Sequence, residues 1–213
     1  MGGRRVQRAS KISNAVSIDQ RPGAVALRQE IGLWETDNVI GKQTDKTALS
    51  VTAERITRLT VLSLTGKSTD AKTKVVIKRL TTFPDRVRIT LTADNGAENT
   101  NHQEIAKKLG VSVFFCHAYH SWEKGTVENT NGRIRRHIPK GMSIDTITEN
   151  QIKTLEHHLN STLRKSFKGY VTLHTKRSCH QIRSSRVCCC LSGITWSATS
   201  SYGGTLGSWS SWE

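Results

Sequence analysis

Three carboxylates stand out because the residues around them are apolar, small or basic. Asp37 lies inside the stretch WETDNVIG, Asp94 follows the strand-like stretch RITLTA, and Glu128 lies in the basic, amide-rich stretch GTVENTNGRIRR. A charge within or directly after a strand that is expected to be buried needs a partner or a metal, because burying an unpaired charge is costly. The three acids are therefore candidates for one shared site.

The chemistry of such a site follows from the charge of its ligands. Three carboxylates held together repel one another by about 4 kcal/mol per pair at 4 Å and an effective dielectric constant of 20. A cation offsets this repulsion, and oxygen ligands without clustered histidine or thiolate are typical of magnesium or manganese. Two such ions about 3.5 to 4 Å apart stabilise the attacking and leaving oxygens of an in-line displacement at phosphorus. The acids thus predict a two-ion Mg²⁺ or Mn²⁺ site.

Each acid also has an ordinary interpretation. Asp94 begins the turn sequence Asp-Asn-Gly, Glu128 could be a solvated helix residue, and Asp37 could cap a neighbouring segment. The combination and its spacing carry the prediction, with 56 residues between the two aspartates and 33 between Asp94 and Glu128.

The elements that must position these acids follow from the periodicity of the apolar residues. Alternating apolar and β-branched residues predict strands at 33–40, 48–54, 59–64, 88–93 and 111–115. Apolar residues at a period of 3.6 predict helices at 69–82, 101–109, 126–137 and 148–159. The order β-β-β-α-β-α-β-α-α predicts an α/β fold, with a mixed five-stranded sheet flanked by helices. In the third helix, Arg135 follows Glu128 by seven residues and so lies nearly on the same face, with Asn131 between them.

The overall charge indicates a polyanionic partner. The chain has 32 Lys and Arg against 17 Asp and Glu, a net charge of +15, and around a phosphodiester site this favours nucleic acid. An anionic membrane surface is the weaker alternative, because no basic amphipathic helix with an aromatic face is visible. No apolar run approaches the roughly 20 residues of a spanning helix, so a soluble, intracellular protein is expected.

Composition divides the 213-residue chain into three zones. Residues 1–30 are predicted to be a basic arm or linker, for which a solvated tail is about as plausible as a DNA contact. Residues 31–175 have the pattern of a folded catalytic domain. Residues 176–213, rich in serine, glycine, cysteine and tryptophan, are predicted to be an aberrant, disordered tail. Four of the five cysteines bunch in that tail without C-x-x-C spacing, which indicates a reducing compartment and no structural metal.

Five stretches together resemble the DDE transposases of the bacterial insertion-sequence thirty group. They are SIDQRPGAVALRQEIGLWETDNVIGK, ERITRLTVLSL, ITLTADNGAENTNHQEIAKKLGVSVFF, YHSWEKGTVENTNGRIRRHIPKG and LNSTLRKSFKGY, and they cover about residues 17 to 173. The resemblance implies the ribonuclease H-like fold of the retroviral integrase catalytic core. It also implies that Asp37, Asp94 and Glu128 are the catalytic, metal-binding triad.

The resemblance assigns further residues to DNA binding and to shaping of the site. Arg135 resembles the basic residue that follows the family's glutamate by two helical turns and contacts DNA or a phosphate. The other predicted DNA contacts are Lys124, Asn131, Arg133 and Arg136. The motif positions expected to shape and position the site are Trp34, Asn95, Gly96, Trp122, Gly125 and Asn131.

The chain also departs from the family pattern. Thr36 stands where a small Gly or Ala is expected before the first aspartate. His117, His120 and Ser121 replace an acidic, proline-rich loop; the two histidines could be metal ligands, but loop histidines near a DNA site are more often surface residues. The pattern fails again at 162–163 and 173–175, and the sequence after Thr175 is interpreted as a frameshift product. We also expect the N-terminal helix-turn-helix region of full-length members to be missing.

The resulting hypothesis is a transposase that uses two Mg²⁺ or Mn²⁺ ions for DNA strand cleavage and strand transfer. Its expected partners are the DNA of the element's ends and of the target, with no membrane, and it is expected to form a homo-oligomer when active. Its expected location is the bacterial cytoplasm, in association with the nucleoid. Two alternatives stay open, a catalytically inactive remnant that only binds DNA and a ribonuclease H-like nuclease that cuts RNA–DNA hybrids.

Overall fold

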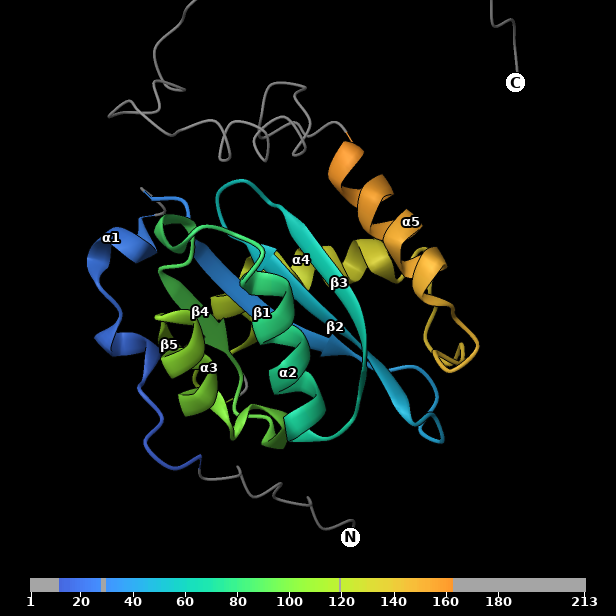
Figure 1. The fold of residues 1–213 in the computed structure, drawn as a ribbon, viewed down its shortest axis with the longest axis horizontal. Coiled ribbons are helices and arrows are strands. Elements are labelled where there is room, and N and C mark those ends of the chain that lie inside the picture. The colour runs from blue at the N-terminus through green and yellow to red at the C-terminus, as the bar shows by residue number, and fades with distance from the viewer. Residues whose placement is uncertain (1–11, 28–29, 119, 163–213) are drawn as a thin grey trace, which may run out of the picture. The chain divides into compact units, whose positions relative to one another are not determined.

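The computed structural model describes residues 12–27, 30–118 and 120–162 (Figure 1). The strands are β1 (Leu33–Val39), β2 (Thr47–Glu54), β3 (Thr60–Gly66), β4 (Thr90–Ala93) and β5 (Ser112–Phe115). The helices are α1 (Gly23–Ala26), α2 (Thr69–Leu80), α3 (His102–Leu109), α4 (Gly125–Ile134) and α5 (Glu149–Ser161). The predicted tail at 176–213 lies outside the described residues, and so does the end of the predicted 31–175 domain.

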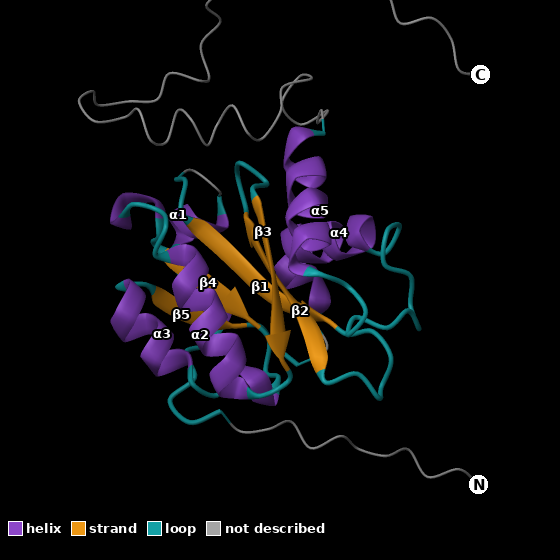
Figure 2. Ribbon diagram, turned by 45° about the vertical axis from the view of Figure 1, so that its right-hand side comes forward, coloured by secondary structure: helices purple, strands orange, loops and turns teal. Residues whose placement is uncertain are grey.

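The strands form one mixed five-stranded sheet, as the sequence predicted, and the structure gives their order as β3-β2-β1-β4-β5 (Figure 2). β1 is antiparallel to β2 and parallel to β4, with Glu35 level with Thr92. Continuing this register by two residues brings Asp94, directly after β4, level with Asp37. Because parallel strands point the same way, their carboxyl ends meet at one edge of the sheet, and the two aspartates meet there too.

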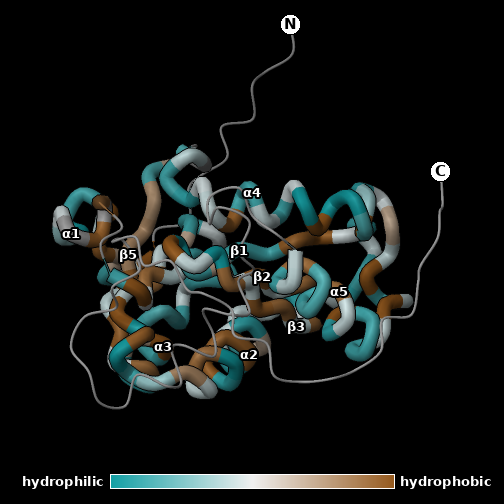
Figure 3. Tube along the Cα trace, turned by 90° about the horizontal axis from the view of Figure 1, so that it is seen from above, coloured by the Kyte–Doolittle hydropathy of each residue, from teal (hydrophilic) through white to brown (hydrophobic). Residues whose placement is uncertain are grey.

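Helices cover both faces of the sheet, with α4 on one side and α2 and α3 on the other (Figure 3). Successive side chains of a strand point to opposite faces, so Trp34 packs with Val76, Leu80 and Ile105 under α2 and α3. A second cluster joins β2 and β3 to α4 and α5 through residues such as Val51, Val127 and Leu155. Glu35 and Asp37 point to the same face as α4.

Local sequence signals explain where the helices begin and end. Ser68 caps α2 by accepting a hydrogen bond from the backbone of Ala71, and Thr148 and Gln151 form a capping box at the start of α5. Gly110 ends α3 with a left-handed φ of 65°. The predicted strand 88–93 starts later than expected, because a short 3-10 turn at Asp85–Val87 continues to Arg88, whose N–H donates to the Asp85 carbonyl.

The segment before β1 packs against the sheet. Ile12 and Val25 are buried, and the N–H of Phe115 in β5 donates to the Val16 carbonyl at 2.9 Å. Among the described helices, none combines the length and the apolarity needed to cross a bilayer.

Candidate active site

The two aspartates converge on a single ammonium group. Lys124 Nζ lies 3.4 Å from Asp37 Oδ1 and 3.0 Å from Asp94 Oδ2. Burial alone would lower the pKa of Lys124, but the charges of Asp37 and Asp94 outweigh burial and raise it. The protein therefore holds one cationic group between the first two acids that the sequence singled out.

Neighbouring amides hold the carboxylate oxygens of both aspartates. Asn131 Nδ2, on α4, donates to Asp37 Oδ2 at 2.8 Å, and the Asn38 N–H donates to Asp37 Oδ1 at 2.9 Å. Asn99 Nδ2 donates to Asp94 Oδ1 at 2.7 Å, and the Gly96 N–H donates to the same oxygen at 3.2 Å. These hydrogen bonds orient each aspartate so that one oxygen faces Lys124.

Charge and burial act in opposite directions on Asp94. Burial opposes ionisation of this carboxyl, but the nearby Lys124 ammonium and then the Lys72 charge outweigh burial and lower its pKa. Asp94 is consequently ionised at neutral pH.

Glu128 completes the group of acids from α4, one helical turn after Lys124. Its side chain is exposed at the rim, and its pKa is raised by burial and then by the charges of Asp37, Asp94 and Glu35, while Lys124 opposes the rise. The charges of both aspartates therefore act on Glu128. The fold thus places Asp37 and Asp94 against one shared cation, with Glu128 one helical turn after Lys124.

α4 is held in place by a carboxylate that the sequence prediction missed. Glu35 is 0% exposed, and its Oε2 accepts hydrogen bonds from the backbone N–H groups of Thr126 and Val127, both at 2.9 Å. Its Oε1 lies 2.9 Å from Arg55 Nε. The first N–H groups of a helix lack partners within the helix and favour a negative charge. Glu35 therefore fixes the start of α4, which carries Glu128 and which Lys124 directly precedes.

A second missed residue is Lys72, which is 1% exposed on α2. Among the described residues, its Nζ has no hydrogen-bond partner. Burial lowers its pKa, against the opposing charges of Glu98, Asp94 and Asp37. Its spacing from Val76 and Leu80, which are four and eight residues further on, is the signal that could have found it, because it places Lys72 on the apolar face.

Some of the residues predicted to contact DNA face the two aspartates, and the others lie away from them. Lys124 and Asn131 face the aspartates, whereas Arg136 is exposed. Arg135 donates from Nη2 to the Ile40 carbonyl at the end of β1, at 2.8 Å. Arg133 is half-buried, and burial followed by the charge of Arg136 lowers its pKa. The three arginines therefore lie in the last turn of α4 and directly after it, further along the chain than Glu128.

The motif residues expected to shape the site lie in different surroundings. Trp34 is buried, and its Nε1 donates to the Val87 carbonyl at 2.8 Å. Asn95 Nδ2 donates to the Cys116 carbonyl at 2.7 Å and so ties the end of β4 to the end of β5. Trp122 is 69% exposed. Thr36 is accommodated at 2% exposure, with its hydroxyl 3.4 Å from the Val51 carbonyl oxygen.

The donor set fits a divalent metal of the magnesium or manganese type. Asp37 and Asp94 already direct one oxygen each toward a shared cation, Lys124 Nζ. The carboxylate oxygens of Asp37, Asp94 and Glu128 are of the type that hard cations prefer as ligands.

Several curated transposases are similar to this chain, although no family model matches it. The transposase for insertion sequence element IS4351 of Bacteroides fragilis is 39% identical over 181 residues, 82% of this chain and 55% of that protein. The transposase for IS1086 of Cupriavidus metallidurans is 32% identical over 80% of this chain and 50% of that protein. Transposase InsI for IS30A of Escherichia coli is 32% identical over 74% of this chain and 41% of that protein. The chain spans about half the length of the curated relatives it matches.

Solved structures with a similar fold are retroviral integrases. The catalytic core domain of BIV integrase matches with a TM-score of 0.51 and 18% identity, over 70% of this chain and 97% of that one. A chain of the simian T-cell lymphotropic virus intasome complex matches with a TM-score of 0.53 and 14% identity, over 80% of this chain and 59% of that one. The described domain therefore has the ribonuclease H-like fold of the integrase catalytic core. Over the region that it shares with the curated relatives, the chain belongs to the family of IS30-type insertion-sequence transposases.

Proposed function

We propose that this chain carries the catalytic centre of a transposase, which cleaves DNA strands and joins them to a target in a metal-dependent reaction. The observation that carries this proposal is the convergence of Asp37 and Asp94 on one cation, Lys124, which lies one helical turn before Glu128. The family of the relatives and the integrase-type fold point to the same chemistry.

Asp37, Asp94 and Glu128 would hold two Mg²⁺ or Mn²⁺ ions. Such ions lower the pKa of an attacking water or 3′-hydroxyl and stabilise the charge that develops on the phosphate. The protein's own contribution is to fix the ligands. Asn131 and Asn99 hold one oxygen of each aspartate, and Glu35 holds the helix that carries Glu128.

The partner in this proposal is DNA, both at the ends of the element and at the target. Lys124 would bind a phosphate oxygen next to the reacting centre, since its ammonium lies between the aspartates. Arg133 in the last turn of α4, and Arg135 and Arg136 directly after it, would contact the DNA backbone. The net charge of +15 supports a binding affinity that falls steeply with salt. We expect an oligomer when the protein is active, because strand transfer joins two DNA molecules.

The test is an Asp94→Asn variant of the full chain in a plasmid-nicking and oligonucleotide strand-transfer assay with Mg²⁺ or Mn²⁺. Both activities should fall by more than about a hundredfold, because a ligand that stabilises transition-state charge is lost. Filter binding to DNA should remain. Asp70→Asn, at an exposed position of α2, is the matched control and should keep full activity.

Two outcomes would refute the proposal. Nicking by Asp94→Asn at the control's rate would exclude the three acids as the catalytic centre. A wild-type chain that binds DNA in a salt-dependent way but never nicks it would favour the DNA-binding alternative. A hybrid RNA–DNA substrate in the same assay tests the nuclease alternative, which requires that the hybrid be cut in preference to duplex DNA.

A further inference from the structure

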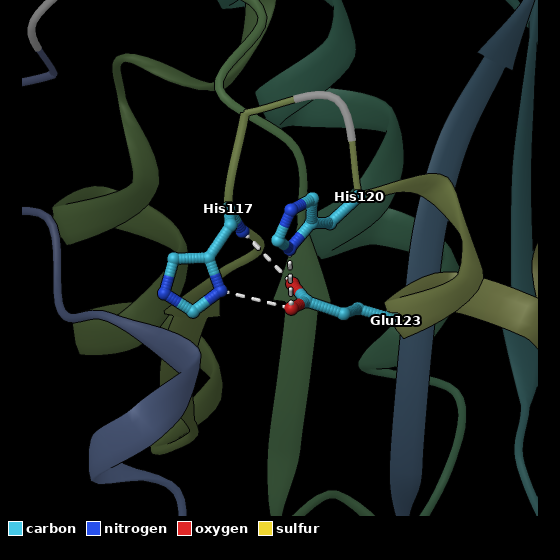
Figure 4. A group of neighbouring side chains, drawn as sticks. All are labelled: His117, His120 and Glu123. Carbon is cyan, nitrogen blue, oxygen red and sulfur yellow. Dashed lines mark hydrogen bonds and ion pairs between the residues drawn. The ribbon is translucent and has the colours of Figure 1, made fainter.

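A second cluster of potential ligands lies in the segment between β5 and α4, outside the three acids. His117, His120 and Glu123 turn toward one another there (Figure 4). His117 Nδ1 lies 2.8 Å from Glu123 Oε1, and His120 Nδ1 lies 3.3 Å from the same oxygen. One ligand atom from each of the three residues lies within 4.8 Å of the other two.

The backbone explains why three residues spaced by three converge. The His120 N–H donates to the His117 carbonyl at 3.2 Å, and the Glu123 N–H donates to the His120 carbonyl at 3.1 Å. The second of these turns enters the 3-10 helix Ser121–Lys124. With three residues per turn, side chains at i and i+3 eclipse one another, so the two histidines and Glu123 lie on one side of the segment.

Each ligand is oriented by a further contact. Glu123 Oε2 accepts the backbone N–H of His117 at 2.8 Å, which leaves Oε1 directed at the two imidazoles. His117 Nε2 lies 2.9 Å from Asp19 Oδ2, and Ser17 Oγ donates to that carboxylate at 2.8 Å. The His120 ring stacks on Trp122, with ring centroids 4.3 Å apart. A carboxylate bonded to the far nitrogen of a histidine is the usual outer partner of a metal-bound imidazole.

We propose that His117, His120 and Glu123 form a zinc-binding site, with Asp19 as the residue that orients His117. Two imidazole nitrogens and one carboxylate oxygen are a common ligand set for Zn²⁺, whose tetrahedral ligands lie about 3.4 Å apart. The histidines are each 42% exposed and Glu123 is 16% exposed, so a water molecule can take the fourth position. No structural metal was predicted from the sequence, because the cysteines lack C-x-x-C spacing. The site proposed here binds through histidine and glutamate, so the cysteine spacing does not bear on it.

This site differs in chemistry from the three acids, and the proposal does not depend on their activity. Nitrogen ligands select zinc over magnesium, whereas the oxygen ligands of Asp37, Asp94 and Glu128 suit the harder ion. The two sites are nevertheless adjacent in the chain, because Glu123 directly precedes Lys124. Zinc would fix the turn that leads into Lys124 and α4.

The rival interpretation is an ion pair without metal. Hydrogen bonds to Glu123 and then to Asp19 raise the pKa of His117, so a protonated His117 could simply bridge two carboxylates. Both interpretations predict the same contacts, and zinc titration separates them.

The test measures zinc binding by the full chain without DNA. In the background variant, Cys179, Cys188, Cys189 and Cys190 are changed to Ser to remove the tail thiolates, and Asp37→Asn and Asp94→Asn remove the oxygen site. Isothermal titration with ZnCl₂ in excess MgCl₂ should then show one zinc per chain. X-ray absorption should show nitrogen and oxygen ligands at about 2.0–2.1 Å, with imidazole scattering.

Three variants and a control assign the ligands. His117→Asn and His120→Asn should each weaken zinc binding at least tenfold, and Asp19→Asn should weaken it about 10- to 100-fold while leaving every ligand in place. His157→Asn, at an exposed position of α5, should leave the affinity unchanged. Thermal melts in EDTA establish that each variant folds. Absence of zinc binding in the background variant, or an affinity unchanged by both ligand histidines, would overturn the proposal in favour of the ion pair.

Discussion

Glu35 and Asp37 are carboxylates two residues apart on the same face of β1, yet their surroundings differ. Glu35 is 0% exposed, and Arg55 and two backbone N–H groups of α4 bind its oxygens. Asp37 is half-buried and shares the Lys124 ammonium with Asp94. One acid is neutralised by partners of its own, whereas the other shares its cation with a second acid.

This difference separates an acid that supports the fold from one suited to chemistry. The partners of Glu35 are a buried guanidinium and the start of a helix, and neither can leave without loss of structure. Asp37 and Asp94 together hold more negative charge than Lys124 neutralises, so a divalent cation can add to them. Two neighbouring carboxylates on one strand therefore differ in whether their cationic partner is their own, as for Glu35, or is shared with a second acid, as for Asp37.

Glu35→Gln should give the largest change in stability. It removes the charge that pairs with Arg55 and faces the start of α4, and breaking a buried ion pair by removing one partner costs about 3–5 kcal/mol. Urea unfolding in EDTA measures the loss. The control is Glu104→Gln, whose partner Lys108 is exposed, and it should change the free energy of unfolding by less than about 1 kcal/mol. Equal stability of the two variants would contradict the structural role of Glu35.

Much of the fold could be predicted from the sequence because its signals are local. Alternation in the first three strands and the 3.6-residue period of α2 and α5 depend only on neighbours in the chain, and the predicted mixed sheet is confirmed. The sequence singled out Asp37, Asp94 and Glu128 because acids in apolar or basic surroundings are unusual and their spacing matches a family pattern.

The remaining features depend on contacts between distant residues. The partners of Glu35 lie 20 residues away at Arg55 and 91 residues away at Thr126, so no local pattern marks it as an anchor of α4. Asn99 orients Asp94 through a turn whose geometry the turn sequence does not specify. Ile12 and Val25 are buried although their basic segment was interpreted as an arm, because burial depends on the surface that the fold offers them.

Lys72→Met should stabilise the metal-free protein. Unlike Glu35 and Asp37, Lys72 is a buried charged residue whose Nζ has no hydrogen-bond partner among the described residues. A buried donor without a hydrogen bond costs about 1–3 kcal/mol, and more when it is charged, whereas methionine fits the apolar face of α2. The pKa of Lys72 is lower in the folded state than in the unfolded state. The destabilisation caused by burying its charge is therefore largest at a pH where the lysine is charged in both states. It disappears as the pH rises toward the unfolded value of 10.5. Thermal unfolding should therefore show a larger gain near about pH 7 than near about pH 10.

The matched control for this variant is Lys74→Met, since Lys74 is exposed on the same helix. It should change stability little at either pH. A Lys72→Met variant that is less stable than the wild type would show that the ammonium is needed to neutralise Asp94 and Asp37.

Glu128→Gln should give the smallest change, and its sign should depend on pH and metal. The folded pKa of Glu128 is raised by burial and then by Asp37, so wild-type stability falls relative to the variant as the pH rises from 4.5 through the folded value. The gain at neutral pH in EDTA should be a few tenths of a kcal/mol, because Glu128 is exposed and solvent screens the repulsion. Added Mg²⁺ should reverse the order, since ligand binding stabilises the folded state and the variant loses a ligand. Thermal melts with and without Mg²⁺ test both signs, and a variant that gains as much from Mg²⁺ as the wild type would place Glu128 with Glu35 among the structural acids.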